Sequence, residues 1–118
     1  MSNLKAVLGE LVRVDGITTA VLVSRDGFVI EGVTTSGTLD TEVVGSVVSA
    51  GIGSSEVMGN ELAVGEINQC MFEYKNGIVV VSLIGDSAIL AIVAGLKANL
   101  GNVRLQVKKR APELEQAL

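Results

Sequence analysis

The sequence predicts an α+β domain in which helices cover both faces of five antiparallel strands, in the order α-β-β-α-β-β-β-α. Three observations support this fold class. Three segments repeat apolar residues at helical spacing, five short segments are rich in Val, Ile, Leu and Thr, and tight-turn dipeptides separate consecutive strands. A length of 118 residues suits one hydrophobic core, so we expect a single domain over 1–118.

The first helix is amphipathic and is expected to end near Arg13, before an Asp-Gly pair. The segments TTAVLVS (18–24) and FVIEG (28–32) are predicted strands, and the Asp-Gly dipeptide between them is typical of a hairpin turn. A second helix is predicted over 39–62 because its apolar residues recur at helical spacing.

Three more strands are predicted over about 64–74, 78–84 and 87–94, where Asn-Gly and Gly-Asp dipeptides indicate an antiparallel meander. The last two strands are continuously apolar, so both of their faces should be covered. A closing helix has one apolar stripe, made by Leu96, Leu100, Val103 and Val107. Pro112 is expected to end or kink this helix and to leave 109–118 as a loosely ordered tail.

The composition limits the classes of function. Apolar residues form 48% of the chain and charged ones 19%, which excludes disorder, and the net charge of −4 argues against nucleic acid as a partner. The cluster Lys108-Lys109-Arg110 is interpreted as a solvated helix end rather than a binding patch. No apolar run is long enough for membrane insertion, and the single Cys70 permits no internal disulfide, so we expect a cytoplasmic protein.

No catalytic or metal-binding group of residues is recognisable. The chain has no histidine, and Cys70 lies in a predicted strand, so a buried thiol is expected there. Gly51 and Gly53 do not form a phosphate-binding loop, because no Lys or Arg occurs over 39–62. A dinucleotide fingerprint would need a third glycine where Glu56 stands. We therefore expect a binding module without cofactor, metal or catalytic residues, and not an enzyme.

The second helix has two contrasting arcs. An apolar arc is expected to face the sheet and consists of Val43, Val44, Val47, Val48, Met58 and Leu62. The opposite arc is small and polar, and consists of Glu42, Gly45, Ser46, Ser49, Gly53, Glu56 and Asn60. Each interior glycine costs a helix about 0.5–1 kcal/mol relative to alanine. Close approach of a second backbone would explain these glycines, and we predict a protein–protein surface here in preference to a merely solvated face.

Three stretches resemble the Roadblock family of dynein-light-chain-like domains, and its short prokaryotic, MglB-like members in particular. They are LVRVDGITTAVLVSRDGFVI (11–30), GDSAILAIVA (85–94) and NLGNVRLQVKKRAPELEQAL (99–118). The resemblance covers nearly the whole chain, although Pro112 departs from the family pattern. It implies a profilin-like fold, with the second helix on one face of a five-stranded sheet and the terminal helices on the other.

The resemblance also implies a homodimer. In such a dimer the strand over 64–74 pairs with its own copy, the helices over 39–62 pack across a two-fold axis, and Ile67, Gln69 and Met71 lie in the interface. Members of the family commonly bind small Ras-like GTPases, and MglB-like dimers act as GTPase-activating proteins. Others are scaffold subunits of GTPase-regulating complexes or of dynein.

The leading hypothesis is a homodimeric regulator of a small Ras-like GTPase. An arginine finger would need an arginine on the docking face, but the second helix has none, and Arg25 and Arg104 lie on other elements. If the protein stimulates GTP hydrolysis, we therefore expect it to do so by repositioning the GTPase's own residues. Glu42 and Glu56 are candidates to pair with basic residues of the partner. An equally good explanation of these two glutamates is that they keep the exposed face of the helix soluble. A non-catalytic scaffold is the first alternative. A small-molecule sensor is the second, and the scarcity of aromatic residues argues against it.

Overall fold

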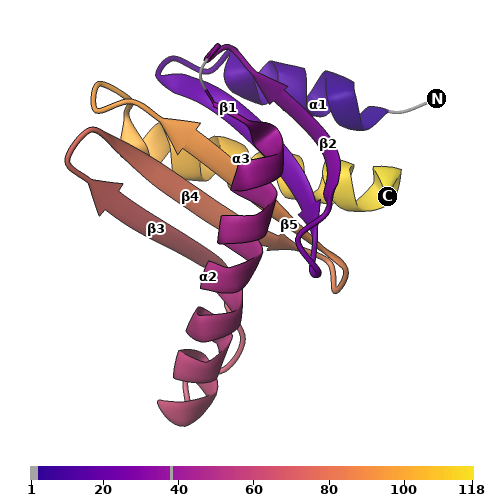
Figure 1. Ribbon diagram of the computed structural model, residues 1–118, viewed down its shortest axis with the longest axis vertical. Coiled ribbons are helices and arrows are strands. Elements are labelled where there is room, and N and C mark those ends of the chain that lie inside the picture. The colour runs from indigo at the N-terminus through magenta and orange to yellow at the C-terminus, as the bar shows by residue number, and fades with distance from the viewer. Residues whose placement is uncertain (1–2, 38) are drawn as a thin grey trace.

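The computed structural model describes residues 3–37 and 39–118, and it confirms the predicted order of elements (Figure 1). The helices and strands have these bounds: α1 Asn3–Val12, β1 Ile17–Ser24, β2 Val29–Thr34, α2 Thr41–Glu61, β3 Gln69–Tyr74, β4 Gly77–Ile84, β5 Ala88–Ala94 and α3 Leu100–Ala117.

The five strands form one antiparallel sheet in the order β2-β1-β5-β4-β3. The predicted hairpin is β1–β2, and the predicted meander is β3–β4–β5. A pairing between β1 and β5 joins these two units, from Ile17 opposite Ala94 to Ser24 opposite Ala88. It places β1, β5 and β4 inside the sheet and leaves β2 and β3 as the edge strands.

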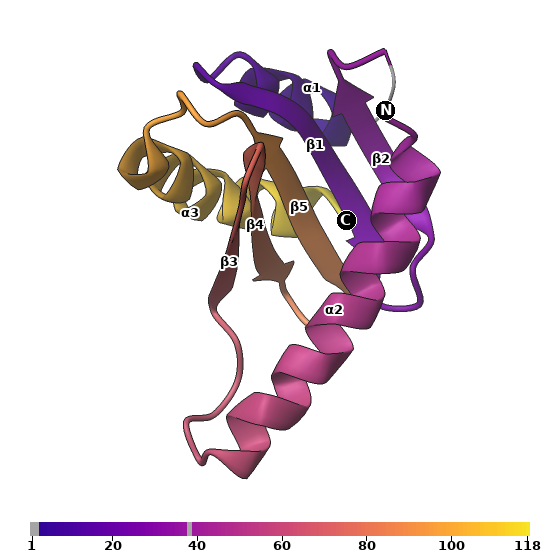
Figure 2. The same cartoon turned by 60° about the vertical axis from the view of Figure 1, so that its left-hand side comes forward.

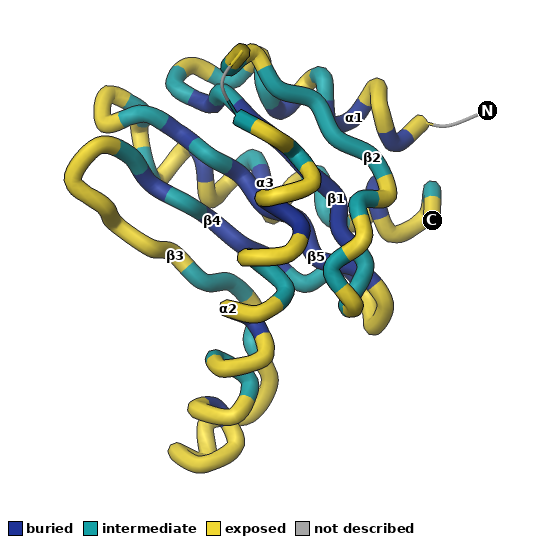
Figure 3. Tube along the Cα trace, viewed as in Figure 1, coloured by how far each residue is buried: buried dark blue, intermediate teal, exposed yellow. Residues whose placement is uncertain are grey.

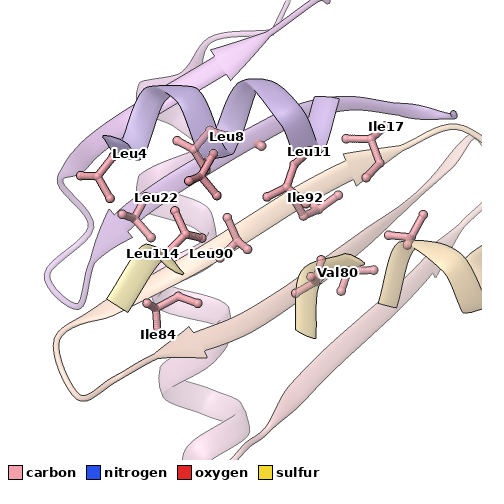
Figure 4. Packing of buried hydrophobic residues seen from close by; sticks show 14 of the residues in the cluster. Leu4, Leu8, Leu11, Ile17, Leu22, Val80, Ile84, Leu90, Ile92 and Leu114 are labelled. Carbon is pink, nitrogen blue, oxygen red and sulfur yellow. The ribbon is translucent and has the colours of Figure 1, made fainter. Parts of the chain in front are cut away.

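Helices lie on both faces of the sheet (Figure 2). α1 and α3 cover one face, where Leu8 and Leu11 meet Leu22, Leu90 and Ile92 in the larger core cluster (Figure 4). α2 covers part of the other face, over a smaller cluster built on Val21, Val23 and Ile89. Fully burying one such side chain contributes about 1.5–3 kcal/mol, which explains why β1 and β5 are apolar on both faces.

The closing helix does not end at Pro112, and residues 109–118 are not a loose tail. α3 continues to Ala117, with the proline inside it. Leu114 is fully buried in the larger core, and Arg110 binds Glu10 of α1 at 2.8 Å. A proline inside a helix costs about 3 kcal/mol, which is comparable with the contribution of a buried leucine. Tertiary packing therefore outweighs the local preference of the proline.

The strand predicted over 64–74 is shorter than expected and begins at Gln69. The residues before it form a connection in which Ala63 (φ 57°) and Gly65 (φ 87°) adopt left-handed backbone conformations. They turn the chain back from the end of α2 toward the sheet. Ile67 therefore lies in the connection and not in the strand.

The position of Leu114 leads to a first prediction. Leu114→Ala should lower the free energy of unfolding by about 2–5 kcal/mol, because it opens a cavity between α3 and the sheet. Gln116→Ala, an exposed position on the same helical turn, should change it by less than about 0.5 kcal/mol. Urea denaturation of both variants measures the difference, and equal midpoints would show that the end of α3 is not packed.

Candidate functional site

α2 lies obliquely across the sheet and extends beyond it. Asp40 begins the helix, since its side chain accepts a hydrogen bond from the Glu42 backbone N–H at 2.9 Å. The N-terminal half packs against β1 and β2, whereas the C-terminal half projects past the sheet in both views (Figures 1 and 2). The face of the sheet toward β3 is therefore left without a helix above it.

The rotation of α2 differs from the one predicted. The buried residues of the helix are Val44, Gly45, Ile52 and Gly59. Four residues of the predicted buried arc are instead exposed: Val43, Val47, Met58 and Leu62. Val47, for example, keeps 61% of its surface accessible. An apolar stripe therefore faces outward from α2, and the prediction that this arc meets the sheet is wrong for these four residues.

Gly45 is the reason for this rotation. It was expected on the outer arc, yet a Cβ atom on Gly45 would lie only 2.7 Å from the Gly27 carbonyl oxygen in the β1–β2 turn. Gly27 itself has φ 97°, and a Cβ there would lie 2.8 Å from Ser49 Oγ. Only small residues at these positions let the turn approach the helix so closely.

The other residues predicted on the small, polar arc have mixed positions. Ser46, Gly53 and Asn60 are exposed, while Ser49 is half-buried beneath the hairpin turn. The Ser46 hydroxyl donates to the Val43 carbonyl oxygen at 3.2 Å, and the Ser49 hydroxyl to that of Ser46 at 3.1 Å. These hydroxyls are satisfied within the helix, so an approaching surface would not have to supply hydrogen-bond partners for them.

β3 is an edge strand that no helix covers, and its side chains are mostly exposed (Figure 3). Two predicted interface residues, Gln69 and Met71, pair in register with Ser82 and Val80. Val80 belongs to the core beneath α1 and α3, so these two side chains lie on the face of the sheet away from α2.

Phe72 and Tyr74 alternate onto the α2 side of β3, and neither was predicted as an interface residue. Both line an apolar hollow of about 210 Å³. We call it the α2–β3 groove; its walls are Val47, Val48, Gly51, Ile52, Phe72, Tyr74, Val79 and Val81. The chain has only three aromatic residues, and all three are exposed, Tyr74 to 60%. Exposed aromatics in a chain with an aliphatic core are the signal that could have found this groove.

A second hollow of about 490 Å³ lies between the end of α2 and the start of β3, and Cys70 is in its wall. Burial raises the pKa of the Cys70 thiol, and a hydrogen bond with Ser55 opposes this only in part. The thiol is therefore protonated near neutral pH and is a poor nucleophile, and it is half-buried where a buried thiol was predicted.

Arg25 joins the β1–β2 turn to α2. Its guanidinium Nη2 lies 2.6 Å from both carboxylate oxygens of Glu56, and each side chain is 34% exposed. Arg25 belongs to another element, as expected, yet it reaches the surface of α2. Glu56 therefore already has a cationic partner within the chain, whereas exposed Glu42 forms no ion pair among residues 3–37 and 39–118.

The described part of the chain shows no group of three or more His, Cys, Asp or Glu side chains that could hold a metal ion. Within the same residues, every helix is too short or too polar to cross a bilayer. The candidate site consists of three surface features: an outward apolar stripe on α2, the α2–β3 groove and the unpaired edge of β3. These features suit binding of another protein.

Comparison with known proteins agrees with this geometry. The model of the Roadblock/LC7 domain family matches residues 4–94. A protein of Methanocaldococcus jannaschii is 32% identical over 114 residues, which cover 97% of this chain and 95% of that protein. MglB of Myxococcus xanthus has a TM-score of 0.90 at 20% identity, covering 97% of this chain and 93% of that one.

A Roadblock/LC7 domain from Streptomyces avermitilis has a TM-score of 0.81 at 26% identity, covering 96% of this chain and 98% of that one. The likeness to MglB extends through α3, beyond the residues that the family model matches. The predicted fold class and the predicted resemblance are both confirmed. The chain belongs to the Roadblock/LC7 family and has its profilin-like α+β fold.

Proposed function

We propose that this chain is a homodimeric binding module of the cytoplasm that regulates a small Ras-like GTPase. In this proposal two copies meet through α2 and β3, and the GTPase docks on the paired α2 helices. The observation that carries the proposal is the sheet face beside α2, where an apolar groove opens next to an unpaired strand edge.

A second copy is the partner that satisfies this face most completely. Antiparallel pairing of β3 with its own copy would bond the free N–H and C=O groups of both edges at once. The projecting half of α2 would then lie over the partner's half of the joined sheet. Several large apolar side chains of this face are exposed in the protomer: Val43, Val47, Val57, Met58, Leu62, Val64, Phe72 and Tyr74. Burying each fully would contribute about 1.5–3 kcal/mol.

The partner proposed to dock on the dimer, a small GTPase, is suggested by the family resemblance and by the acidic charge of this side of the protein. Residues 25–66, which include the hairpin turn, β2 and α2, carry a single base, Arg25. The same stretch carries seven acids: Asp26, Glu31, Asp40, Glu42, Glu56, Glu61 and Glu66. This side of the molecule would attract a basic surface such as one beside a nucleotide-binding site. The fold likeness to MglB of Myxococcus xanthus supports the architecture, and the regulatory activity remains the proposal.

The dimer is tested by Gly53→Arg. No heavy atom would lie within 4 Å of a Cβ on Gly53, so the protomer accommodates the change. In the proposed dimer the arginine would separate the two α2 helices, and the mass in solution should fall from dimer to monomer. Analytical ultracentrifugation over a range of concentrations measures this change.

Gly9→Arg is the matched control, because Gly9 also lies in a helix and also has open space around it. It should leave the dimer intact. A wild-type monomer, or a Gly53→Arg variant that dimerises as strongly as Gly9→Arg, would exclude α2 from the interface.

The regulatory role is tested with the small GTPase encoded nearest to this gene. We expect the GTPase to co-purify with the protein when loaded with a GTP analogue and to bind more weakly when loaded with GDP. Single-turnover hydrolysis should be faster with the protein than without it. Equal binding to both nucleotide states would contradict a state-specific regulator, and binding with an unchanged rate would favour the scaffold.

Arg25 contacts α2 through Glu56, and its contribution can be measured separately. Arg25→Gln should change the stimulated hydrolysis rate by less than about threefold, because the proposed mechanism repositions the GTPase's own residues. Glu56→Gln breaks the same ion pair but keeps the guanidinium, and we expect the same small effect. A loss of about 10³-fold in Arg25→Gln alone would instead identify an arginine finger.

A further inference from the structure

A second groove lies on the opposite face of the sheet from α2. It has a volume of about 730 Å³ and opens between α3 and the adjoining ends of β3 and β4. We call it the α3 groove; the lining residues that matter here are Asn68, Gln69, Ser82, Arg104, Leu105 and Lys108. It exists because α3 packs on β4 and leaves β3 uncovered on this side.

Two cations on α3 stand at the wall of this groove, one helical turn apart. Arg104 donates from Nε to Gln69 Oε1 at 2.9 Å, which holds its guanidinium across the opening. Within residues 3–37 and 39–118, neither Arg104 nor Lys108 forms an ion pair with a carboxylate. Arg110 differs from both, because it binds Glu10 at 2.8 Å and Glu113 at 3.0 Å. The charges of Arg104 and Lys108 therefore remain available to a ligand.

Among the residues that the structure describes, no carboxylate lines the groove, although the chain has 13 acidic residues against 9 basic ones. Acidic and basic residues are thus unevenly distributed, with the acids concentrated in the segment that includes α2. The remaining walls carry the amides of Asn68 and Gln69 and the hydroxyl of Ser82, whose Oγ donates to the Asn68 carbonyl oxygen at 3.3 Å. This charge pattern is complementary to an anion that also forms neutral hydrogen bonds.

Exposed apolar side chains beside the cations favour a ligand with an apolar part over a simple anion. Leu105 lies between the two cations in sequence and is 60% exposed, and Met71 of β3 is exposed on the same face of the sheet. A phosphate group would leave both side chains in water. A peptide with carboxylates four residues apart on a helix would match the spacing of Arg104 and Lys108 and could place an apolar side chain on Leu105.

We propose that the α3 groove binds an acidic peptide segment of a partner protein, with its carboxylates on Arg104 and Lys108 and an apolar side chain on Leu105. This site goes beyond the proposed GTPase function, because it lies on the other face of the sheet from α2. It shares only Gln69 of β3 with the strand at which the proposed dimer pairs. It also changes the interpretation of the cluster Lys108-Lys109-Arg110, since only Lys108 lines the groove.

The test uses a fluorescein-labelled helical peptide with glutamates four residues apart and leucines on the adjoining face, together with a copy in which glutamine replaces each glutamate. Fluorescence anisotropy with the full chain should show binding of the glutamate peptide only, and the affinity should fall as salt is raised. The double variant Arg104→Gln/Lys108→Gln should bind it about three- to tenfold more weakly. Leu105→Ser should also weaken binding.

Lys5→Gln/Lys109→Gln is the matched control, because it removes the same charge from two exposed positions outside the groove. It should leave the affinity within about twofold. Equal weakening by both double variants would overturn the proposal in favour of general electrostatic attraction. Amide NMR shifts confined to α2 would also overturn it, as would tighter binding to phosphatidylserine vesicles or single-stranded RNA through the same two cations.

Discussion

The close approach of the β1–β2 turn to α2 is the contact on which the functional surfaces depend. A Cβ atom on Gly45 would lie 2.7 Å from the Gly27 carbonyl oxygen, so a larger residue would push the turn and the helix apart. This contact fixes the rotation of α2 about its axis. Val44 and Ile52 then point into the core, while Val43 and Val47 point away from it. Gly45 thus stabilises the fold by letting the backbone of the turn pack against α2, and this offsets its low helix propensity.

The same turn restrains α2 further along its length, through the ion pair between Arg25 and Glu56. The helix is therefore held toward the β1–β2 side of the sheet and cannot also cover β3 and β4. Its projecting half, the α2–β3 groove and the bare edge of β3 all follow from this placement (Figure 3). The protomer has an open apolar face because the one helix on that side is held off-centre. The proposed association with another chain would cover this face.

Local signals were sufficient for the order of elements, since helical periodicity and turn dipeptides act over a few residues. The rotation of α2 was not predictable in this way, because valines occur around much of the helix and the deciding contact joins Gly45 to a turn 18 residues earlier. The prediction that the closing helix ends or kinks at Pro112 failed for a similar reason, because the burial of Leu114, which holds the end of α3 in place, is a tertiary effect. Phe72 and Tyr74 share a face in any strand that contains both, but the position of α2 over that face is a tertiary feature, and it was needed to recognise the groove.

The two grooves differ in their relation to the family. The α2–β3 groove is built wholly from residues within 4–94, the part of the chain that the family model matches. The α3 groove takes one wall from that part, through Gln69 and Ser82, and the other from α3, which lies beyond it. Membership of the family therefore bears on the first surface and leaves the second undetermined. The likeness to MglB of Myxococcus xanthus extends through α3 as well, so a ligand held by Arg104 and Lys108 would depend on these two side chains and not on the fold alone.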